Sequence, residues 1–198
     1  MLLTLATQNE GKLRELQSLL AEERLPIEAR SLAQIGTRDQ AEEVGKTFGQ
    51  NALLKAAWAA EQGHGWALAD DSGLCVDALG GAPGIHSARW SGRGDEANNA
   101  LLLEKLAGVP AARRGAYYRC ALALCHPSGE ALLVEADVAG RIAEAPRGTN
   151  GFGYDPLFEI PEWALTFGEV DLARKETRSH RALAFRKAVP LLRILSRG

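Results

Sequence analysis

The stretch that says most about the fold is Trp66-Ala67-Leu68-Ala69-Asp70-Asp71-Ser72-Gly73. Its first four residues are apolar and predict a short buried strand, 66–69, which the two carboxylates and the glycine end abruptly. The apolar run 74–79 predicts another short strand, and a glycine-rich turn follows it. Two carboxylates at the end of a buried strand favour a functional site at that place.

The chain before this stretch alternates strands and helices. Residues 2–6 are apolar and predict a buried strand, and leucines at helical spacing follow Asn9, which is a good helix N-cap. A second short strand is expected near 27–30. Residues 47–50 have the Ser/Thr-x-x-Glu/Gln form of a capping box and predict a helix that runs to Gly63.

Two further helices are expected after this stretch. Asp95 can cap one that extends through Leu106. The other begins near Ser179 and has apolar residues on one face. Pro190 should kink or break this second helix, because its ring clashes with the preceding turn and it lacks an N–H.

A long β-hairpin completes the predicted sheet. Segments 116–125 and 131–142 have strand character and are separated by a turn-forming Pro-Ser-Gly. A hairpin beside strand–helix units makes the sheet mixed. The 198 residues are enough for one sizeable core. We therefore expect an α/β fold with a central mixed β-sheet flanked by helices, in a single domain over 1–198.

The composition excludes several classes of protein. Hydrophobic residues make up 46% and charged residues 24%, which is ordinary for a globular α/β protein. The net charge is −2 and no block of Lys or Arg stands out, so we expect no nucleic-acid partner, and a nucleotide partner would have to be free. The apolar start, 1–6, is too short for a signal peptide or a membrane span, so we expect a cytoplasmic protein without a membrane partner.

Residues 7–12, Thr-Gln-Asn-Glu-Gly-Lys, connect the predicted strand 2–6 to the predicted helix that follows it. The N–H groups and the dipole of a helix start favour an anion, and Lys12 adds a full positive charge, so a phosphate fits here. Gly11 lets a ligand approach the backbone. The alternative is an Asn-capped helix with a solvated lysine, and the motif by itself favours that alternative.

Carboxylates and a lysine are candidate metal and phosphate ligands. Asp70 and Asp71 crowd negative charge unless a cation or hydrogen bonds compensate, and magnesium prefers a few carboxylates together with waters and phosphate oxygens. A turn in which these aspartates cap local N–H groups is equally compatible with the sequence. Glu43 and Lys55 flank the capped helix, where a solvated helix face explains them as well. Glu42 beside Glu43 leaves the choice of carboxylate open.

The glycine-rich loop 148–153 presents an aromatic ring. Phe152 stands between two glycines and could stack on a base, while a tight turn with inward-packed aromatic residues is the alternative. Further on, His180 and Arg181 lie at a helix start, where cations are unfavourable unless an anion or acceptor is near. They could donate hydrogen bonds to a carbonyl oxygen.

Five motifs in one order decide between these alternatives. They are Thr-x-Asn-x-x-Lys at 7–12, Asp-Asp-Ser-Gly-Leu at 70–74, Gly-Gly-Ala-Pro-Gly at 80–84, Gly-Thr-Asn-Gly-Phe-Gly-Tyr-Asp-Pro at 148–156 and Ser-His-Arg at 179–181. With them the chain resembles the inosine/xanthosine triphosphate pyrophosphatase family, also called the HAM1-like family. The resemblance spans Thr7 to Arg181, and the long glycine-aromatic motif is highly specific.

The resemblance implies a fold, an activity and a set of site residues. The fold would be elongated and two-lobed, with the active site in the cleft, and the protein a homodimer. The activity would hydrolyse the α–β phosphoanhydride of inosine, deoxyinosine and xanthosine triphosphates to a monophosphate and pyrophosphate. The resemblance assigns Glu43 and Asp71 to Mg²⁺, and Asp71 also to activation of the attacking water. The residues that would bind the nucleotide are Thr7, Gln8, Asn9, Glu10, Gly11, Lys12, Lys55, Ser72, Phe152, Gly153, Tyr154, Asp155, Lys175, His180 and Arg181.

Selectivity among purines would follow from hydrogen bonding to the base. Hypoxanthine and xanthine present a carbonyl at position 6 and an N–H at position 1, whereas adenine presents an amino group and a bare nitrogen. Donors from His180 and Arg181 would satisfy the carbonyl and reject adenine. Guanine shares the carbonyl, and the sequence does not identify the residue that excludes it.

Two other functions are compatible with parts of the sequence. A Maf-like nucleotide pyrophosphatase would prefer other bases, and the Ser-His-Arg and Gly-Phe-Gly-Tyr-Asp motifs speak against it. A catalytically silent nucleotide-binding regulator is the other alternative. The presence of Lys12, Glu43, Lys55 and Asp71 argues against a loss of activity.

Overall fold

The structure is a computed structural model that describes residues 1–37 and 39–197. The chain divides into two compact units. Unit 1 comprises Met1–Asp71, Cys120–Ala136 and Arg181–Gly198, and unit 2 comprises Ser72–Arg119 and Asp137–His180. Two compact units are what a two-lobed protein requires, while the cleft and the single-domain assignment stay predictions.

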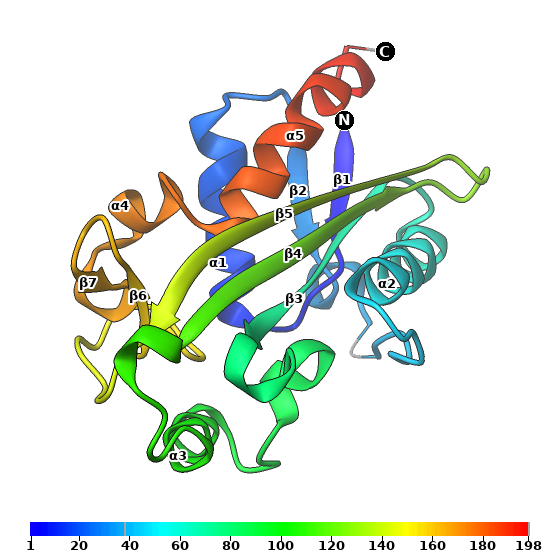
Figure 1. The fold of residues 1–198 in the computed structure, drawn as a ribbon. Helices are drawn as coiled ribbons and strands as arrows, with labels where there is room; N and C mark the ends of the chain where they lie inside the picture. The colour runs from blue at the N-terminus through cyan, green and yellow to red at the C-terminus, as the bar shows by residue number, and fades with distance from the viewer. Residues whose placement is uncertain (38, 198) are drawn as a thin grey trace. The chain divides into compact units, whose positions relative to one another are not determined.

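Seven strands form one sheet in the order β2-β1-β3-β4-β5-β6-β7 (Figure 1). Strand β1 pairs in parallel with β2 and with β3, whereas β6 pairs antiparallel with β5 and β7, so the predicted mixed sheet is confirmed. The strands are β1 (Leu2–Leu5), β2 (Glu28–Ser31), β3 (Ala67–Val76), β4 (Gly115–Cys125), β5 (Ala131–Ile142), β6 (Phe158–Ile160) and β7 (Leu165–Thr166). The helices are α1 (Glu10–Glu22), α2 (Phe48–Gly63), α3 (Asp95–Lys105), α4 (Leu172–Glu176) and α5 (His180–Leu195).

The core of unit 1 lies where α1 and α5 pack together on the sheet (Figure 1). Leucines of α1 at helical spacing, among them Leu16 and Leu20, meet the fully buried Leu3 and Leu5 of β1. Phe185 of α5 is also fully buried in this cluster. Burial of such side chains is the main favourable contribution to folding, at about 1.5–3 kcal/mol for each large one.

Unit 2 has an aromatic core. The rings of Tyr118 and Phe158 have centroids 4.6 Å apart, and those of Phe158 and Phe167 are 5.3 Å apart. Both pairs are tilted rather than stacked, which is a favourable arrangement for the ring quadrupoles. Along the chain, Phe158 of this core follows the predicted base-binding loop 152–155 by a few residues.

Local capping signals correctly located the two helices of unit 1 that begin near the predicted site. The Asn9 side chain accepts a hydrogen bond from the Lys12 N–H and starts α1. The Thr47 hydroxyl accepts from the Gln50 N–H and starts α2. The capping box is incomplete, because Gln50 Oε1 accepts from the N–H of Lys46 and not from that of Thr47.

The prediction of two short strands around the aspartates was wrong. Residues 67–76 form one strand, β3, which is buried along nearly its whole length, and Asp77–Leu79 is a 3-10 helix. Asp70 and Asp71 therefore lie within a central strand and not in a turn at its end. The strand continues past them because both carboxylates find cationic partners, described below. At Gly73 a Cβ would come within 2.5 Å of the Gly84 carbonyl oxygen, so the strand needs a glycine there.

Two helix predictions also need correction. Gly94, and not Asp95, is the N-cap of α3, and Asp95 is its first residue. Helix α5 continues through Pro190 to Leu195 and is not broken there. The buried Ala188, Val189 and Leu192 hold the helix against the core on either side of the proline, and this packing outweighs the lost N–H.

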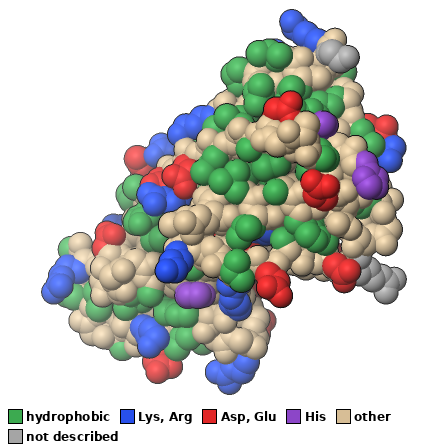
Figure 2. Space-filling model, turned by 90° about the vertical axis from the view of Figure 1, so that its right-hand side faces the viewer, with side chains coloured by type: hydrophobic (Ala, Val, Ile, Leu, Met, Phe, Trp, Pro, Cys, Tyr) green, Lys and Arg blue, Asp and Glu red, His purple; other side chains and the backbone are tan. Residues whose placement is uncertain are grey.

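The face of the molecule drawn in Figure 2 has side chains of both charges. Acidic and basic side chains are interspersed over the face drawn in Figure 2, with no large basic area on that face. In the described part of the chain no helix combines the length and the apolar character that crossing a membrane requires.

Gly148 gives a stability test of the loop that precedes the predicted base-binding segment. Its φ is +77°, and a Cβ there would come within 1.9 Å of the Gly168 carbonyl oxygen. Gly92 has a similar φ of +70° but open space around it. We expect Gly92→Ala to lower the free energy of unfolding by about 1–2 kcal/mol, from backbone strain alone. Gly148→Ala should cost about 1–3 kcal/mol more, because the backbone must also move.

Urea unfolding of both variants measures the difference. If both variants lost the same free energy of unfolding, the backbone of Gly168 would not lie as close to Gly148 as the structure shows.

Candidate active site

The predicted phosphate loop is the turn between β1 and α1. The Thr7 hydroxyl accepts a hydrogen bond from the Asn9 N–H at 3.1 Å, and Asn9 Oδ1 accepts from the Lys12 N–H at 3.1 Å. These bonds fix the turn and place Lys12 in the first turn of α1. Gln8 donates to the Asp39 carbonyl oxygen at 3.4 Å. The loop is therefore ordered by its own side chains, beside a helix start whose partial charge favours an anion.

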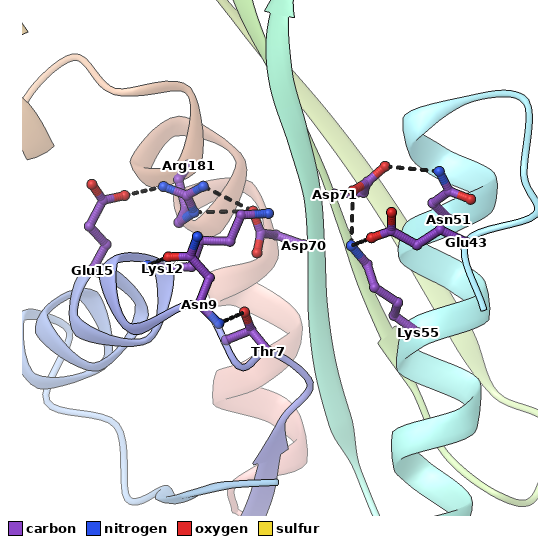
Figure 3. Close-up of polar contacts among 10 residues, drawn as sticks. All are labelled: Thr7, Asn9, Lys12, Glu15, Glu43, Asn51, Lys55, Asp70, Asp71 and Arg181. Atoms are coloured by element: carbon purple, nitrogen blue, oxygen red, sulfur yellow. Dashed lines mark hydrogen bonds and ion pairs between the residues drawn. The ribbon is translucent and has the colours of Figure 1, made fainter. Parts of the chain in front are cut away.

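Lys12 points to one face of β3, where Asp70 lies (Figure 3). Lys12 Nζ is 3.0 Å from Asp70 Oδ2, and the same oxygen accepts from Arg181 Nη2 at 3.0 Å. Arg181 also contacts Glu15 of α1. Arg181, Asp70 and Glu15 are all at most 3% exposed, so two positive and two negative side chains form a buried network.

The network sets the ionisation of Asp70. Burial alone would raise the pKa of this carboxyl group, but the charges of Lys12 and Arg181 outweigh burial and hold that pKa well below its usual value. Conversely, burial works to lower the pKa of Arg181, and Asp70 and Glu15 raise it by more. Both groups are therefore charged across the physiological pH range.

Asp71 points to the opposite face of β3, toward α2 (Figure 3). Lys55 Nζ is 2.9 Å from Asp71 Oδ1 and 3.0 Å from Glu43 Oε1. Asn51 Nδ2 donates to Asp71 Oδ2 at 3.2 Å, and Asn51 Oδ1 accepts from the Gly45 N–H at 2.8 Å. Asn51, fully buried, thus joins Asp71 to the segment that contains Glu43. The structure pairs Glu43 with Lys55, while the choice between Glu42 and Glu43 as the metal ligand stays a prediction.

Burial and neighbouring charges also have opposite effects on the pKa of Asp71, but here burial has the larger effect. Burial raises the pKa of this carboxyl group, and Lys55 and Lys12 offset the rise only in part. For Lys55, burial works to lower the pKa, but Asp71, Asp70 and Glu43 raise it overall. A carboxylate with a raised pKa is the better proton acceptor of the pair, which suits Asp71 to activation of water.

The donor set around Lys55 fits a magnesium ion. The carboxylates of Glu43 and Asp71 both lie beside the ammonium group of Lys55, so two negative charges meet one positive charge at this place. Among residues 1–37 and 39–197 no group of three or more His, Cys, Asp or Glu side chains could hold a metal. Two carboxylates are sufficient for Mg²⁺, because it keeps several waters and binds phosphate oxygens of a substrate.

The predicted base-binding loop lies in unit 2 and is organised by Asp155. Asp155 Oδ2 accepts from the Phe152 N–H at 2.9 Å and from Lys175 Nζ at 2.6 Å. Lys175 Nζ also lies 4.9 Å from the centroid of the Phe152 ring, a cation–π distance. At Gly151 a Cβ would come within 2.0 Å of the Asp155 carboxylate, so this position requires glycine. Phe152 is half-buried and its ring is held by a buried ion pair.

The remaining predicted residues differ in their surroundings. Tyr154 is buried, and its hydroxyl donates to the Ser87 carbonyl oxygen at 3.0 Å, so it anchors the loop in the core. The His180 ring stacks on the Tyr118 ring, with centroids 4.6 Å apart. Glu10 lies in an exposed ion pair with Arg14, 3.7 Å apart. Ser72, half-buried, follows Asp71 directly in β3.

The predicted site residues are therefore divided between the two units. Unit 1 brings together Lys12, Glu43, Lys55 and Asp71, with Arg181 in the network around Asp70. Unit 2 brings together Phe152, Gly153, Tyr154, Asp155 and Lys175, and it contains Ser72 and His180.

The Ham1 family sequence model matches residues 3–191 of this chain. The chain belongs to the Ham1 family. A relative named dITP/XTP pyrophosphatase from Exiguobacterium sibiricum is 50% identical in an alignment of 190 residues that covers 94% of each chain. The family resemblance inferred from the five motifs is thus confirmed.

Solved structures of Ham1 proteins share the fold. The structure of a HAM1 protein from Coxiella burnetii matches with a TM-score of 0.86 at 37% identity, over 100% of both chains. A nucleoside-triphosphatase, dITP/XTP pyrophosphatase from Mycobacterium abscessus matches with a TM-score of 0.76 at 42% identity, over 96% of this chain and 100% of that one. The predicted α/β fold with a mixed sheet is the Ham1 fold.

The sequence analysis gave no role to three residues of these two networks. Glu15 lies one turn after Lys12 on α1, and Asn51 lies one turn before Lys55 on α2. This spacing places each on the face of its helix that also presents the lysine, and it is the signal that could have found them. Asp70 was considered but received no role, because its partner Arg181 is 111 residues away in sequence.

Arg181 gives a test of the buried network. Arg181→Met removes the positive charge that Asp70 and Glu15 share, so two buried carboxylates lose their common cation while Lys12 stays beside Asp70. We expect the free energy of unfolding to fall by about 3–5 kcal/mol, the usual cost of breaking a buried ion pair. Chemical denaturation measures it.

Arg186→Met is the matched control on the same helix. Its guanidinium lies 3.5 Å from Glu22, and both side chains are about a third or more exposed. We expect a change of about 0–1 kcal/mol. A similar small loss in Arg181→Met would contradict the structural role of the network.

Proposed function

We propose that the chain hydrolyses the α–β phosphoanhydride of inosine, deoxyinosine and xanthosine triphosphates to a nucleoside monophosphate and pyrophosphate. The observation that carries the proposal is the pair of lysines on the two faces of β3, each beside one of two consecutive aspartates. Relatives at 46–50% identity are named dITP/XTP pyrophosphatase, which supports the same substrate class here.

Phosphoanhydride hydrolysis requires positioning and charge neutralisation more than covalent chemistry. Asp71, with its raised pKa, would accept the proton of the attacking water. Lys12 and Lys55 would neutralise the charge that develops on the departing pyrophosphate. Mg²⁺, when bound by Glu43 and Asp71, would supply further positive charge and lower the pKa of bound water. Thr7 to Gly11 would hold phosphate oxygens beside the start of α1.

Base recognition would use the residues of unit 2 and the start of α5. Phe152 would stack on the purine and contribute affinity with little selectivity. Ser72, Gly153, Tyr154, Asp155 and Lys175 would shape the pocket around it. Donors from His180 and Arg181 would meet the carbonyl at position 6 of hypoxanthine or xanthine. Because Arg181 already contacts Asp70 and Glu15, we propose that His180 has the larger part in reading the base.

The molecular setting belongs to the same proposal. The substrates would be free purine nucleotides in the cytoplasm, and the protein would be a homodimer. The absence of a dominant basic area on the face in Figure 2 supports a free nucleotide over a nucleic acid. No observation favours the Maf-like or the catalytically silent alternative.

A panel of nucleoside triphosphates with separation of the products tests the function. Inosine and xanthosine triphosphates should give monophosphate and pyrophosphate. Adenosine triphosphate should be hydrolysed with a kcat/KM at least about 30-fold lower, since two mismatched polar groups on the base each cost on the order of 1–3 kcal/mol. Release of diphosphate and phosphate, or equal rates with adenosine triphosphate, would refute the proposal.

Asp71→Asn tests the assignment of the metal and the base to one side chain. The variant keeps the shape of the carboxylate and the acceptor for Asn51 but loses its charge. We expect kcat to fall at least about 100-fold and the affinity for Mn²⁺, measured by electron paramagnetic resonance without substrate, to weaken. Asp77→Asn is the control, since Asp77 is exposed just beyond β3. Turnover that is undiminished in chelator would remove the metal from the mechanism, and wild-type turnover in Asp71→Asn would remove Asp71.

A further inference from the structure

Two side chains from the first turns of α3 hold the loop that contains Phe152. Asp95 Oδ2 accepts a hydrogen bond from the Gly153 N–H at 2.7 Å, and Asn99 Nδ2 donates to the Gly153 carbonyl oxygen at 2.9 Å. Asp95 and Asn99 are four residues apart and so lie on one face of the helix. All of these groups belong to unit 2.

The two contacts fix the backbone on one side of Phe152. The Gly153 N–H belongs to the peptide group that joins it to Phe152, and its carbonyl belongs to the next peptide group. On the other side, the Phe152 N–H is held by Asp155 Oδ2 at 2.9 Å. The peptide groups before and after Phe152 are therefore both held by carboxylates, which fixes the direction of the Cα–Cβ bond from which the ring projects.

Capping of α3 does not explain Asp95. The N-cap is Gly94, and the Asp95 carboxylate contacts a residue 58 positions later in the chain. By contrast the neighbouring Asn98, which is buried, donates to the carbonyl oxygens of Ser87 and Ala88 and so serves the turn before the helix. Asp95 and Asn99 instead both bond to Gly153 of the Phe152 loop.

The stability of the fold alone does not explain an asparagine at position 99. In the part of the chain that the structure describes, its Oδ1 atom is buried and has no hydrogen-bond partner. A buried acceptor without a partner costs free energy, so its retention calls for another reason. The bond from Nδ2 to Gly153 supplies one, because a hydrocarbon side chain of the same size could not make it.

We propose that Asp95 and Asn99 are positioning residues for purine binding. They hold the Phe152 loop in the conformation that stacks on the base before the nucleotide arrives, so that binding does not have to order it. The inference rests on the proposed function, since it takes Phe152 as the stacking residue. It assigns to α3 a share of the affinity for the base and none of the contacts with the phosphates.

Inosine monophosphate is the probe, because it contains the base and is not hydrolysed by the proposed reaction. Calorimetry should give dissociation constants about five- to tenfold higher for Asp95→Ala and Asn99→Leu than for the wild type, as expected for the loss of one hydrogen bond that orders the loop. Asp95→Asn keeps an oxygen acceptor for the Gly153 N–H and should stay within about twofold of the wild type. Glu96→Ala is the matched control, an exposed acid of the same turn.

Kinetics with inosine triphosphate separate positioning from a general loss of structure. KM should rise in Asp95→Ala and Asn99→Leu while kcat and the inhibition constant of inorganic tripolyphosphate, which has no base, stay unchanged. Asn99→Leu should also unfold at no lower urea concentration than Asp95→Ala, because it removes the unsatisfied oxygen. Wild-type affinity for inosine monophosphate in both variants, or an equal weakening of tripolyphosphate, would overturn the inference.

The same measurements separate the two proposals. If the wild type binds inosine monophosphate and the variants bind it more weakly, the inference stands even when inosine triphosphate is not hydrolysed. If the wild type hydrolyses inosine triphosphate and the variants bind the monophosphate normally, the proposed function stands and the inference fails. A wild type that binds no inosine monophosphate contradicts the inference, while the product panel still decides the proposed function.

Discussion

The structure depends on how two adjacent carboxylates are accommodated within one buried strand. A strand directs successive side chains to opposite faces, so Asp70 and Asp71 do not face each other. Each meets its own cation, Lys12 for Asp70 and Lys55 for Asp71. Without these partners the desolvation of two charges would cost several kcal/mol. The charges within the strand are therefore compensated by side chains of α1 and α2.

The same arrangement separates two chemical tasks. Lys12 and Arg181 hold the pKa of Asp70 below its usual value, so Asp70 stays a fixed negative charge that orients both cations. Asp71 has a raised pKa, because its burial outweighs the charge of Lys55. One residue of the pair is thus held as a fixed charge and the other is the more readily protonated, although the two have the same side chain and are neighbours in sequence.

Sequence patterns predicted what depends on neighbours along the chain. Asn9 and Thr47 cap their helices through bonds to residues three positions later, so a local signal was sufficient. The continuity of β3 was missed, because the charge that allows it comes in part from Arg181, 111 residues away. The prediction that Pro190 could break α5 was wrong for a similar reason, since the local sequence does not show the tertiary packing that keeps this helix intact.

The site residues follow the same division. The glycine-aromatic motif marked the loop around Phe152, but nothing near it in the sequence pointed to Asp95 as the group that holds it. A helix-capping preference was the obvious interpretation of Asp95, and it was wrong because Gly94 takes the cap and leaves the carboxylate for another partner. Motifs thus locate the groups that meet a ligand, whereas the groups that hold them in place come from distant segments and emerge only from the fold.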